Sequence, residues 1–188
     1  MKFENIINQN KLYIILLLLI LLFSFYLRVF ALGEAPFWID ESISSIASKN
    51  ILEKGLPIFD SGLFYGRSLV FHYSQSVSML LFGINDFGAR FPSVIFGLLT
   101  IILAFLFGRE FFSESSEKNY YALIPALVFG LFFLEVFFSR QARFYQLFQL
   151  AFFATIYLMY KSKDNNNFTA STNIGSVLLE LPNDGKRL

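Results

Sequence analysis

One uninterrupted apolar segment near the N-terminus constrains this chain more than any other feature. Residues 12–32 read LYIILLLLILLFSFYLRVFAL and contain one charged side chain, Arg28, close to the far end. An α-helix needs roughly 20 such residues to cross the hydrocarbon core of a bilayer. A cleaved signal peptide is disfavoured, because the run is too long and lacks a small-x-small cleavage site. The segment therefore predicts a membrane-spanning helix, with the Arg28 head extended to the interface and Trp38 at headgroup depth.

The composition is typical of a membrane protein. Hydrophobic residues make up 55% of the sequence and charged residues 15%, and the 26 phenylalanines exceed what a soluble domain of this size normally carries. The net charge is +1 and the basic residues are scattered, so we expect no nucleic-acid partner. The absence of cysteine excludes disulfides, thiolate metal sites and cysteine nucleophiles. We expect an all-α integral membrane protein.

Three further segments have the length and apolarity of spans, which makes about four transmembrane helices in all. They are residues 91–108, 121–138 and 144–160. Residues 68–83 are diluted by a histidine, a glutamine and serines, and they predict an interfacial or partly buried helix, with a true span as the alternative. This segment belongs to a large loop, residues 33–90, between the first two spans.

The placement of lysine predicts the orientation. Lysines precede the first span and follow the last one (Lys2, Lys11, Lys161 and Lys163). Because positive charge favours the cytoplasmic side, we expect a multi-pass protein of the cell membrane with both termini cytoplasmic and the large loop extracytoplasmic. Residues 1–164 would form the membrane domain. Residues 165–188 form a polar, turn-rich tail, expected to be disordered or to be the end of a truncated chain.

Two adjacent acids, Asp40 and Glu41, follow Trp38 at the start of the large loop. The pattern from residue 40 to 55 predicts a short amphipathic helix with Ile43, Ile46, Ala47 and Ile51 near one face, lying on the outer surface of the membrane or against other spans. Asp40 would cap its N-terminus and Glu41 would favour the first turn. Alternatively, a carboxylate held beside a lipid-facing pocket can act as a general base toward a hydroxyl.

Basic side chains are available on the same side of the membrane. They are Arg67, His72, Arg90, Arg140 and Arg143. On a helix, Arg140 and Arg143 would share a face and present two guanidinium groups to one phosphate. An anion would also explain why both stand where the positive-inside rule disfavours them. Glu135 is expected to pair with one of them.

His72 is the only histidine and leaves three alternatives open: a metal ligand, a hydrogen-bonding group at the acceptor site, or a packing residue.

Three motifs together resemble a known family. They are WIDE at residues 38–41, GINDFGARFPSVIFG at 83–97 with FGREFF closing that span, and RQARFY at 140–145. Over residues 12–160 the chain resembles the N-terminal part of the GT-C glycosyltransferases of the dolichyl-phosphate-mannose protein mannosyltransferase and aminoarabinose transferase type.

This resemblance implies an inverting glycosyltransferase that moves a sugar from a polyprenyl-phosphate donor to a hydroxyl of a protein or lipid acceptor on the extracytoplasmic side. It places Asp40 at the catalytic centre as general base, with Glu41 as a supporting or structural acid. Arg140 and Arg143 become candidates to bind the donor phosphate or to anchor the first loop. Arg67 stands where many relatives have a lysine before two prolines, and the prolines are absent here.

The resemblance assigns no metal ligand and no required cofactor, and a divalent metal is the one possible addition. Two other interpretations remain. The chain would be a non-catalytic remnant or subunit of such a membrane complex, or a fragment of a polytopic transporter in which the acids handle substrate or protons.

Overall fold

All regular elements are helices in the computed structural model, which describes the backbone of residues 2–164 and the side chains of residues 12–162. The all-α prediction is therefore confirmed for the described part, and the predicted tail, residues 165–188, lies outside it. The helices are α1 (Lys2–Val29), α2 (Ile39–Lys54), α3 (Leu69–Phe82), α4 (Asp86–Phe111), α5 (Lys118–Tyr121), α6 (Leu123–Leu131), α7 (Phe133–Ser139) and α8 (Tyr145–Asp164).

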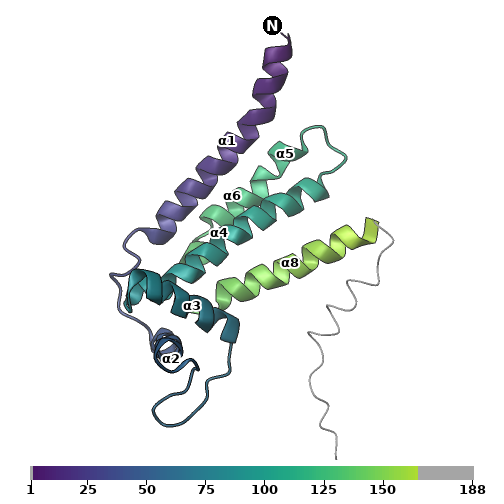
Figure 1. The fold of residues 1–188 in the computed structure, drawn as a ribbon. Coiled ribbons are helices and arrows are strands. Elements are labelled where there is room, and N and C mark those ends of the chain that lie inside the picture. The colour runs from purple at the N-terminus through teal and green to yellow at the C-terminus, as the bar shows by residue number, and fades with distance from the viewer. Residues whose placement is uncertain (1, 165–188) are drawn as a thin grey trace, which may run out of the picture.

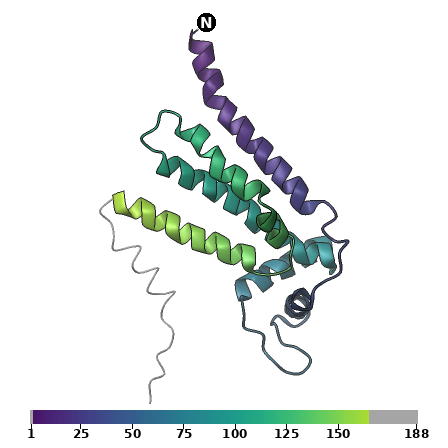
Figure 2. The same ribbon diagram turned by 180° about the vertical axis from the view of Figure 1, so that it is seen from behind.

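The helices form a bundle with a cap at one end. Helices α1, α4, α6 and α8 run beside one another, with α4 in contact with the other three, and α2 and α3 lie together across one end (Figure 1). The view from behind shows that the N-terminal end of α1, the α4–α5 connection and the C-terminal end of α8 point away from α2 and α3 (Figure 2). The large loop therefore lies at the opposite end of the bundle from the start of α1 and the end of α8.

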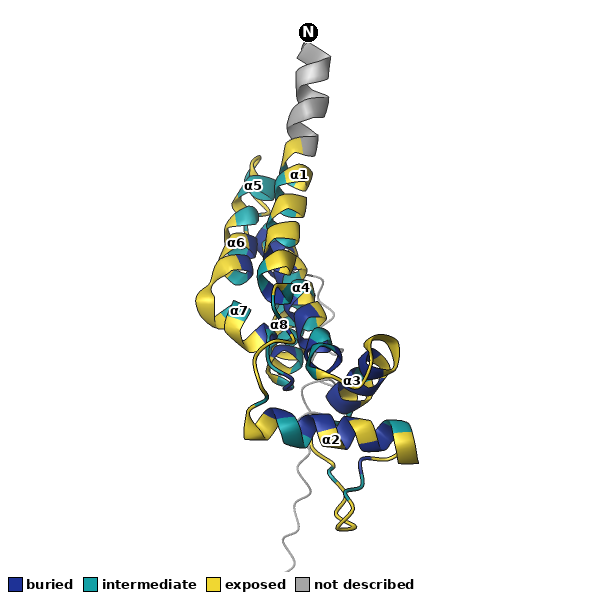
Figure 3. Ribbon diagram, turned by 90° about the vertical axis from the view of Figure 1, so that its left-hand side faces the viewer, coloured by how far each residue is buried: buried dark blue, intermediate teal, exposed yellow. Residues whose placement is uncertain are grey.

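Two of the predicted spans are confirmed as helices long and apolar enough to cross a membrane. They are Leu12–Val29 within α1 and the whole of α4. α4 begins five residues before the predicted 91, because Asn85 caps it by accepting a hydrogen bond from the Gly88 N–H at 2.8 Å. In the described part of α1, exposed and half-buried residues predominate (Figure 3) and only 11% of the span is buried, as expected for a helix that faces lipid.

The third predicted span, residues 121–138, is not one continuous helix. Helices α6 and α7 are bent by 57° at Phe132, whose backbone is extended at φ −60° and ψ 128°. The pair counts as one further span if the bend lies within the bilayer, so the described residues hold two spans, or up to three. The fourth predicted segment, 144–160, is helical within α8 but does not reach the same apolarity, and its crossing stays a prediction.

The core of the bundle lies between α4 and α6. Ile101 and Phe105 of α4 pack there against Ala122 and Ala126, with side chains of α1 around them. Small residues allow the close approach, since a Cβ on Gly108 would stand only 2.9 Å from Pro125 Cγ. This packing holds α4 rigidly at the centre of the molecule.

Helix α2 confirms the predicted short helix of the large loop but buries a different face. Its buried side chains are mainly polar, and Ser48 Oγ donates to Gln75 Oε1 of α3 at 2.5 Å. Ala47 and Ile51 are buried as expected, whereas Ile46 is exposed. Polar contacts to α3 and α4 therefore decide how α2 turns, rather than the isoleucine stripe. α3 matches the predicted partly buried helix at residues 68–83.

Candidate functional site

Glu41 forms a buried ion pair with Arg90 of α4. Arg90 Nε donates to Glu41 Oε1 at 2.9 Å and Arg90 Nη2 donates to Oε2 at 3.0 Å, and the two side chains are 2% and 4% exposed. Oε1 also accepts from the Ala142 N–H at 2.7 Å and Oε2 from the Trp38 N–H at 3.1 Å. The carboxylate thus joins α2, α4 and the link between α7 and α8.

These contacts bear on the two roles expected for Glu41, catalytic and structural. Burial on its own would raise the pKa of the Glu41 carboxyl, but the hydrogen bonds from Arg90, Ala142 and Trp38 lower the pKa below its ordinary value. Both oxygens already accept two hydrogen bonds each. The contacts favour the structural role expected for Glu41, and its catalytic role stays a prediction.

Arg90 ties the first loop to the start of α4. Its Nη1 donates to the carbonyls of Leu32 at 2.9 Å and Ala35 at 2.8 Å, and its Nη2 donates to that of Pro36 at 3.3 Å. The sequence presents Arg90 only as one of several cations. The feature that marks Arg90 is its position in the ARFPS motif, as its partner Glu41 is marked by the WIDE motif.

Ser93, at the end of ARFPS, reaches the third motif. Its hydroxyl donates to the Gln141 carbonyl at 2.6 Å and to the Arg143 carbonyl at 3.1 Å. The three motifs that lie far apart in the sequence thus meet around the beginning of α2.

Asp40 points away from this buried network. Its side chain is 64% exposed, and the nearest opposite charge is Arg143 Nη2, 3.8 Å from Asp40 Oδ2. The prediction that Asp40 caps the helix is wrong, because Trp38 occupies the N-cap position and Asp40 lies inside the first turn. Asp40 is left with an accessible carboxylate beside a fixed arginine.

Arg143 is a fixed neighbour of Asp40. Its Nη1 donates to the Asp40 carbonyl at 3.1 Å and to Ser44 Oγ at 3.0 Å. Burial would lower its pKa, but hydrogen bonds with the side chains of Tyr65 and Tyr145 and the charge of Asp40 raise the pKa above its ordinary value. Arg143 is therefore charged, and its Nη1 is committed to the protein, whereas its buried Nε has no hydrogen-bond partner among the described residues.

Arg140 does not share a helix face with Arg143. Helix α7 ends at Ser139, and α8 starts only at Tyr145, so the link between them is not helical. Arg140 Nη1 donates to the carbonyls of Leu27 at 2.8 Å and Phe30 at 2.7 Å, at the end of α1. The expected pair of parallel guanidinium groups aimed at one phosphate is therefore wrong.

Arg67 differs from the other two predicted arginines. It is exposed, and its guanidinium has no hydrogen bond or ion pair to another described residue. It stands two residues after Tyr65, which contacts Arg143. Among the three arginines, Arg67 is the exposed one, and its whole guanidinium is available to a ligand.

His72 is buried next to this loop, with its ring centroid 5.3 Å from that of Tyr65 and its imidazole near the Arg67 backbone. Burial, with a contribution from the charge of Arg143, lowers the pKa of His72 to about 4. The ring is neutral near pH 7. His72 therefore cannot supply positive charge to a phosphate, and its packing against Tyr65 supports the structural alternative.

Two further charged residues differ from expectation. Glu135 pairs with neither arginine of the link, since its Oε1 accepts from Gln149 Nε2 of α8 at 2.6 Å. Arg28 does not extend to the interface but is fully buried and bonded to the bend at Phe132. Within the described residues, no three His, Asp or Glu side chains gather as a metal site would need, and a divalent metal stays a prediction.

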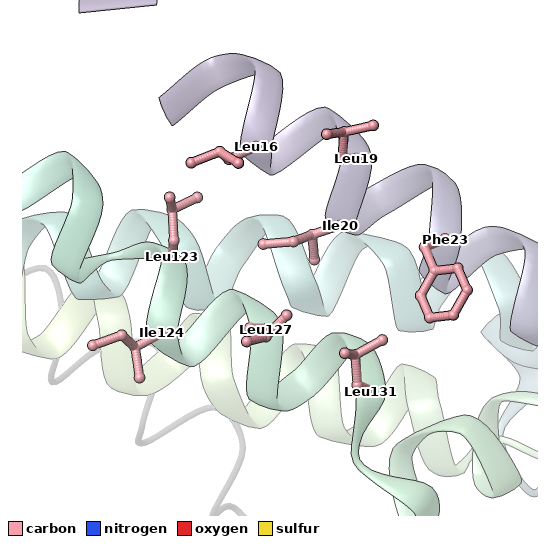
Figure 4. Close-up of a pocket in the computed structure, with 8 residues that line it drawn as sticks. All are labelled: Leu16, Leu19, Ile20, Phe23, Leu123, Ile124, Leu127 and Leu131. Carbon is pink, nitrogen blue, oxygen red and sulfur yellow. The ribbon is translucent and has the colours of Figure 1, made fainter. Parts of the chain in front are cut away.

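One hollow lies beside these residues, and a second lies between α1 and α6. A small one of 130 Å³ is lined by Trp38, Glu41, Arg90, Arg140 and neighbouring residues of the first loop and α7. A groove of 420 Å³ between α1 and α6 is lined only by apolar side chains, from Leu16 to Phe23 and from Leu123 to Leu131 (Figure 4). The groove has no polar group to orient a sugar and suits a lipid chain.

The fold and the motifs define a membrane protein with a cluster of charged residues held at one end of its bundle. Residues 66–177, more than half of the chain, match the family described as dolichyl-phosphate-mannose-protein mannosyltransferase. The chain belongs to this family, a family of GT-C glycosyltransferases, as the resemblance implied.

The chain is also similar to an uncharacterized protein of Aquifex aeolicus (strain VF5). The two are 26% identical over 136 residues, which are 70% of this chain and 26% of that protein. The chain thus spans about a quarter of the length of this curated relative. No solved structure matches the chain.

Proposed function

We propose that this chain carries the catalytic carboxylate of a glycosyltransferase that uses a polyprenyl-phosphate sugar, and that Asp40 is its general base. The observation that carries the proposal is the contrast between the two adjacent acids. Glu41 is buried and fully bonded, whereas Asp40 is exposed and held near Arg143. A base must be reachable by the hydroxyl whose proton it takes, and only Asp40 of the two is reachable.

The proposed reaction is a single displacement. The acceptor oxygen attacks the anomeric carbon while its proton passes to the Asp40 carboxylate, so that a new carbon–oxygen bond forms. The bond between the anomeric carbon and the phosphate oxygen breaks on the opposite face, and the polyprenyl phosphate leaves with the electron pair. The sugar is inverted, and no oxidant or reductant is needed.

The leaving phosphate needs positive charge, and the free donors of Arg67 suit that role best. Nη1 of both Arg140 and Arg143 is already bonded to protein carbonyls, and Arg143 is buried, so neither is as accessible to a phosphate as Arg67. We therefore assign Arg67 to the donor phosphate, and Arg143 to holding the Asp40 backbone and Ser44 in place. The apolar groove between α1 and α6 would accept lipid chains in the same membrane.

The transporter alternative has less support from the same contacts. Its acids should line one continuous path, but Glu41 is bonded to Arg90 and Glu135 to Gln149. Asp40 belongs to α2, which lies across the capped end of the bundle (Figure 1). A glycosyltransferase with its centre on the extracytoplasmic side of the cell membrane needs only one accessible acid, and Asp40 meets that requirement.

The test compares Asp40→Asn with Asp60→Asn, because Asp60 is an exposed acid of the same loop. Each purified variant of the full chain is placed in proteoliposomes with radiolabelled polyprenyl-phosphate mannose and, separately, a serine- and threonine-containing peptide or a hydroxylated lipid. We expect Asp40→Asn to lose transfer by a factor of about 100 or more. Asp60→Asn should stay within about twofold of wild type, because Asp60 is exposed, pairs with Lys54 and has no role in the proposed reaction.

Wild-type transfer with full activity in Asp40→Asn would remove Asp40 as base. No transfer by the wild-type chain with either acceptor would instead favour the non-catalytic alternative. Insertion of each variant is checked by carbonate extraction, which should not differ between them.

A further inference from the structure

Two arginines each donate hydrogen bonds to backbone carbonyls at the C-terminal end of another helix. Arg28 of α1 donates to Gly130 O at 2.8 Å and Phe129 O at 3.0 Å, at the end of α6. Arg140, directly after α7, donates to Leu27 O at 2.8 Å and Phe30 O at 2.7 Å, at the end of α1. We call these contacts the reciprocal arginine caps.

Helix ends explain why both arginines are needed. The last four carbonyls of a helix have no partner within it and carry the negative end of the helix dipole. Inside a bilayer an unpaired carbonyl is costly, because no water can bind it. Arg28 is fully buried, so its charge must also find partners in the protein. The caps pair the freed carbonyls and give partners to Nη1 and Nη2 of Arg28.

The first cap lies at the bend of the third predicted span. Phe132 interrupts the helix with an extended backbone and frees the carbonyls at the end of α6. Gly130 lets α1 approach there, since a Cβ on it would stand 2.6 Å from Ser24 Oγ. Arg28 therefore fixes the point from which α7 departs at 57°.

The second cap lies where α7 ends and the link to α8 begins. Three residues further along this link stands Arg143, which donates to the Asp40 carbonyl. Neither arginine of the caps contacts Asp40 itself. The caps nevertheless position both ends of α7. Because Arg143 follows Arg140 by only three residues, its position depends on where α7 ends.

The other charged groups near the caps do not replace them. Glu135 acts on Arg28 only through its charge and is hydrogen-bonded to Gln149. Arg90, near Arg140, is paired with Glu41.

We propose that Arg28 and Arg140 are positioning residues that set the angle of α7 and thereby hold Arg143 against Asp40. The effect on transfer rests on the proposed function, whereas the effect on the angle does not. A lysine cannot replace either arginine, because its single ammonium group cannot span two carbonyls with the fork geometry of guanidinium.

The angle is followed through a distance between two spin labels, measured by double electron–electron resonance in lipid nanodiscs. Because the chain has no cysteine, spin labels go to Leu22→Cys on α1 and Phe133→Cys on α7, both exposed. The control pair, Leu18→Cys and Ile124→Cys, is also exposed and joins α1 to α6 before the bend. Each pair is measured with Arg28→Lys, Arg140→Lys and, as a matched conservative change elsewhere, Arg109→Lys on α4.

We expect Arg28→Lys and Arg140→Lys to broaden and shift the distance between positions 22 and 133 and to leave the control distance unchanged. Arg109→Lys should change neither. An unchanged distance between positions 22 and 133 in both cap variants would overturn the proposal. So would equal broadening of the control pair, because it would indicate general loosening of the bundle rather than a change at the bend.

Transfer provides the second readout. Both cap variants should lower kcat by up to about 100-fold while KM for the donor stays near that of wild type, because they displace Arg143 without touching Arg67. A displaced α7 with unchanged kcat would overturn the positioning role. If the wild-type chain shows no transfer, the proposed function fails, and the distances still decide whether the caps set the angle.

Discussion

At the scale of single residues, two neighbouring acids have opposite fates because a helix turns about 100° per residue. That rotation directs Glu41 toward Arg90 and leaves Asp40 in the open. The sequence could predict that the acids begin a helix and that one of them is structural. It could not predict which way the helix faces, because the partner of Glu41 is 49 residues away in the sequence.

The Glu41–Arg90 pair should dominate the stability of this end of the molecule. Replacing Glu41 by Gln leaves Arg90 charged and buried without a carboxylate, which costs about 3–5 kcal/mol when one partner of a buried pair is removed. We expect a clear fall in the melting temperature of Glu41→Gln in detergent. The control is Glu34→Gln, an exposed acid of the same loop, which should melt like wild type.

The same pair predicts a dependence of stability on pH. The pKa of Glu41 is lower in the folded than in the unfolded protein, so the contribution to the free energy of unfolding is complete above the unfolded pKa of about 4.3. It disappears as the pH falls through the lower, folded pKa. Melting curves between pH 7 and pH 3 should show this loss in wild type and a smaller one in Glu41→Gln. Identical pH profiles for the two proteins would contradict the assignment.

Arg67 should affect donor binding more than any other arginine of the cluster. Because its guanidinium has no other bond to lose among the described residues, Arg67→Ala should leave stability unchanged and raise KM for the polyprenyl-phosphate donor about tenfold, the worth of one charged hydrogen bond. Initial rates at varied donor concentration measure this. Lys54→Ala, on the same loop, is the control, and equal KM values for the two variants would exclude Arg67.

At the scale of helices, the positions of helical segments could be predicted from the sequence, but the bend within one of them could not. The predicted helices at 40–55 and 68–83 are present as α2 and α3, because apolar spacing and glycine endings act locally. The bend at Phe132 has no such local signal, since no proline interrupts the apolar run there. Its stabilising partner, Arg28, lies 102 residues before Gly130, whose carbonyl it binds next to the bend. Only tertiary packing could show the break.

Gly97 is a sensitive point where four helices meet. A Cβ there would stand 3.0 Å from Ser139 Cβ, 3.2 Å from Arg28 Nε and 3.3 Å from Gln146 Oε1. Gly97→Ala should therefore overpack the site and lower the free energy of unfolding by about 1–3 kcal/mol, although alanine favours a helix. Denaturation in mild detergent measures the change. The exposed Leu99→Ala on the same helix should cost less than about 0.5 kcal/mol, and a stabilised Gly97→Ala would contradict the packing.

At the scale of the whole molecule, the arrangement of helices makes a prediction about the membrane. Helix α4 is long and apolar enough to cross, and it separates the large loop from the α4–α5 connection (Figure 1). If α4 spans the bilayer, these two regions lie on opposite sides of the membrane. The lysines at the start of α1 and the end of α8 lie at the same end of the bundle as the connection, which favours the cytoplasm for the connection and the extracytoplasmic side for the loop.

Single cysteines test this topology directly, because the chain contains none. Ser61→Cys in the large loop and Ser116→Cys in the α4–α5 connection are both exposed positions. In intact cells a membrane-impermeant maleimide should label Ser61→Cys and not Ser116→Cys, whereas in inverted vesicles the pattern should reverse. Labelling of both positions from the same side would mean that α4 does not cross, and Asp40 and Arg67 would then lose their place on the face where a lipid-linked sugar is proposed to react.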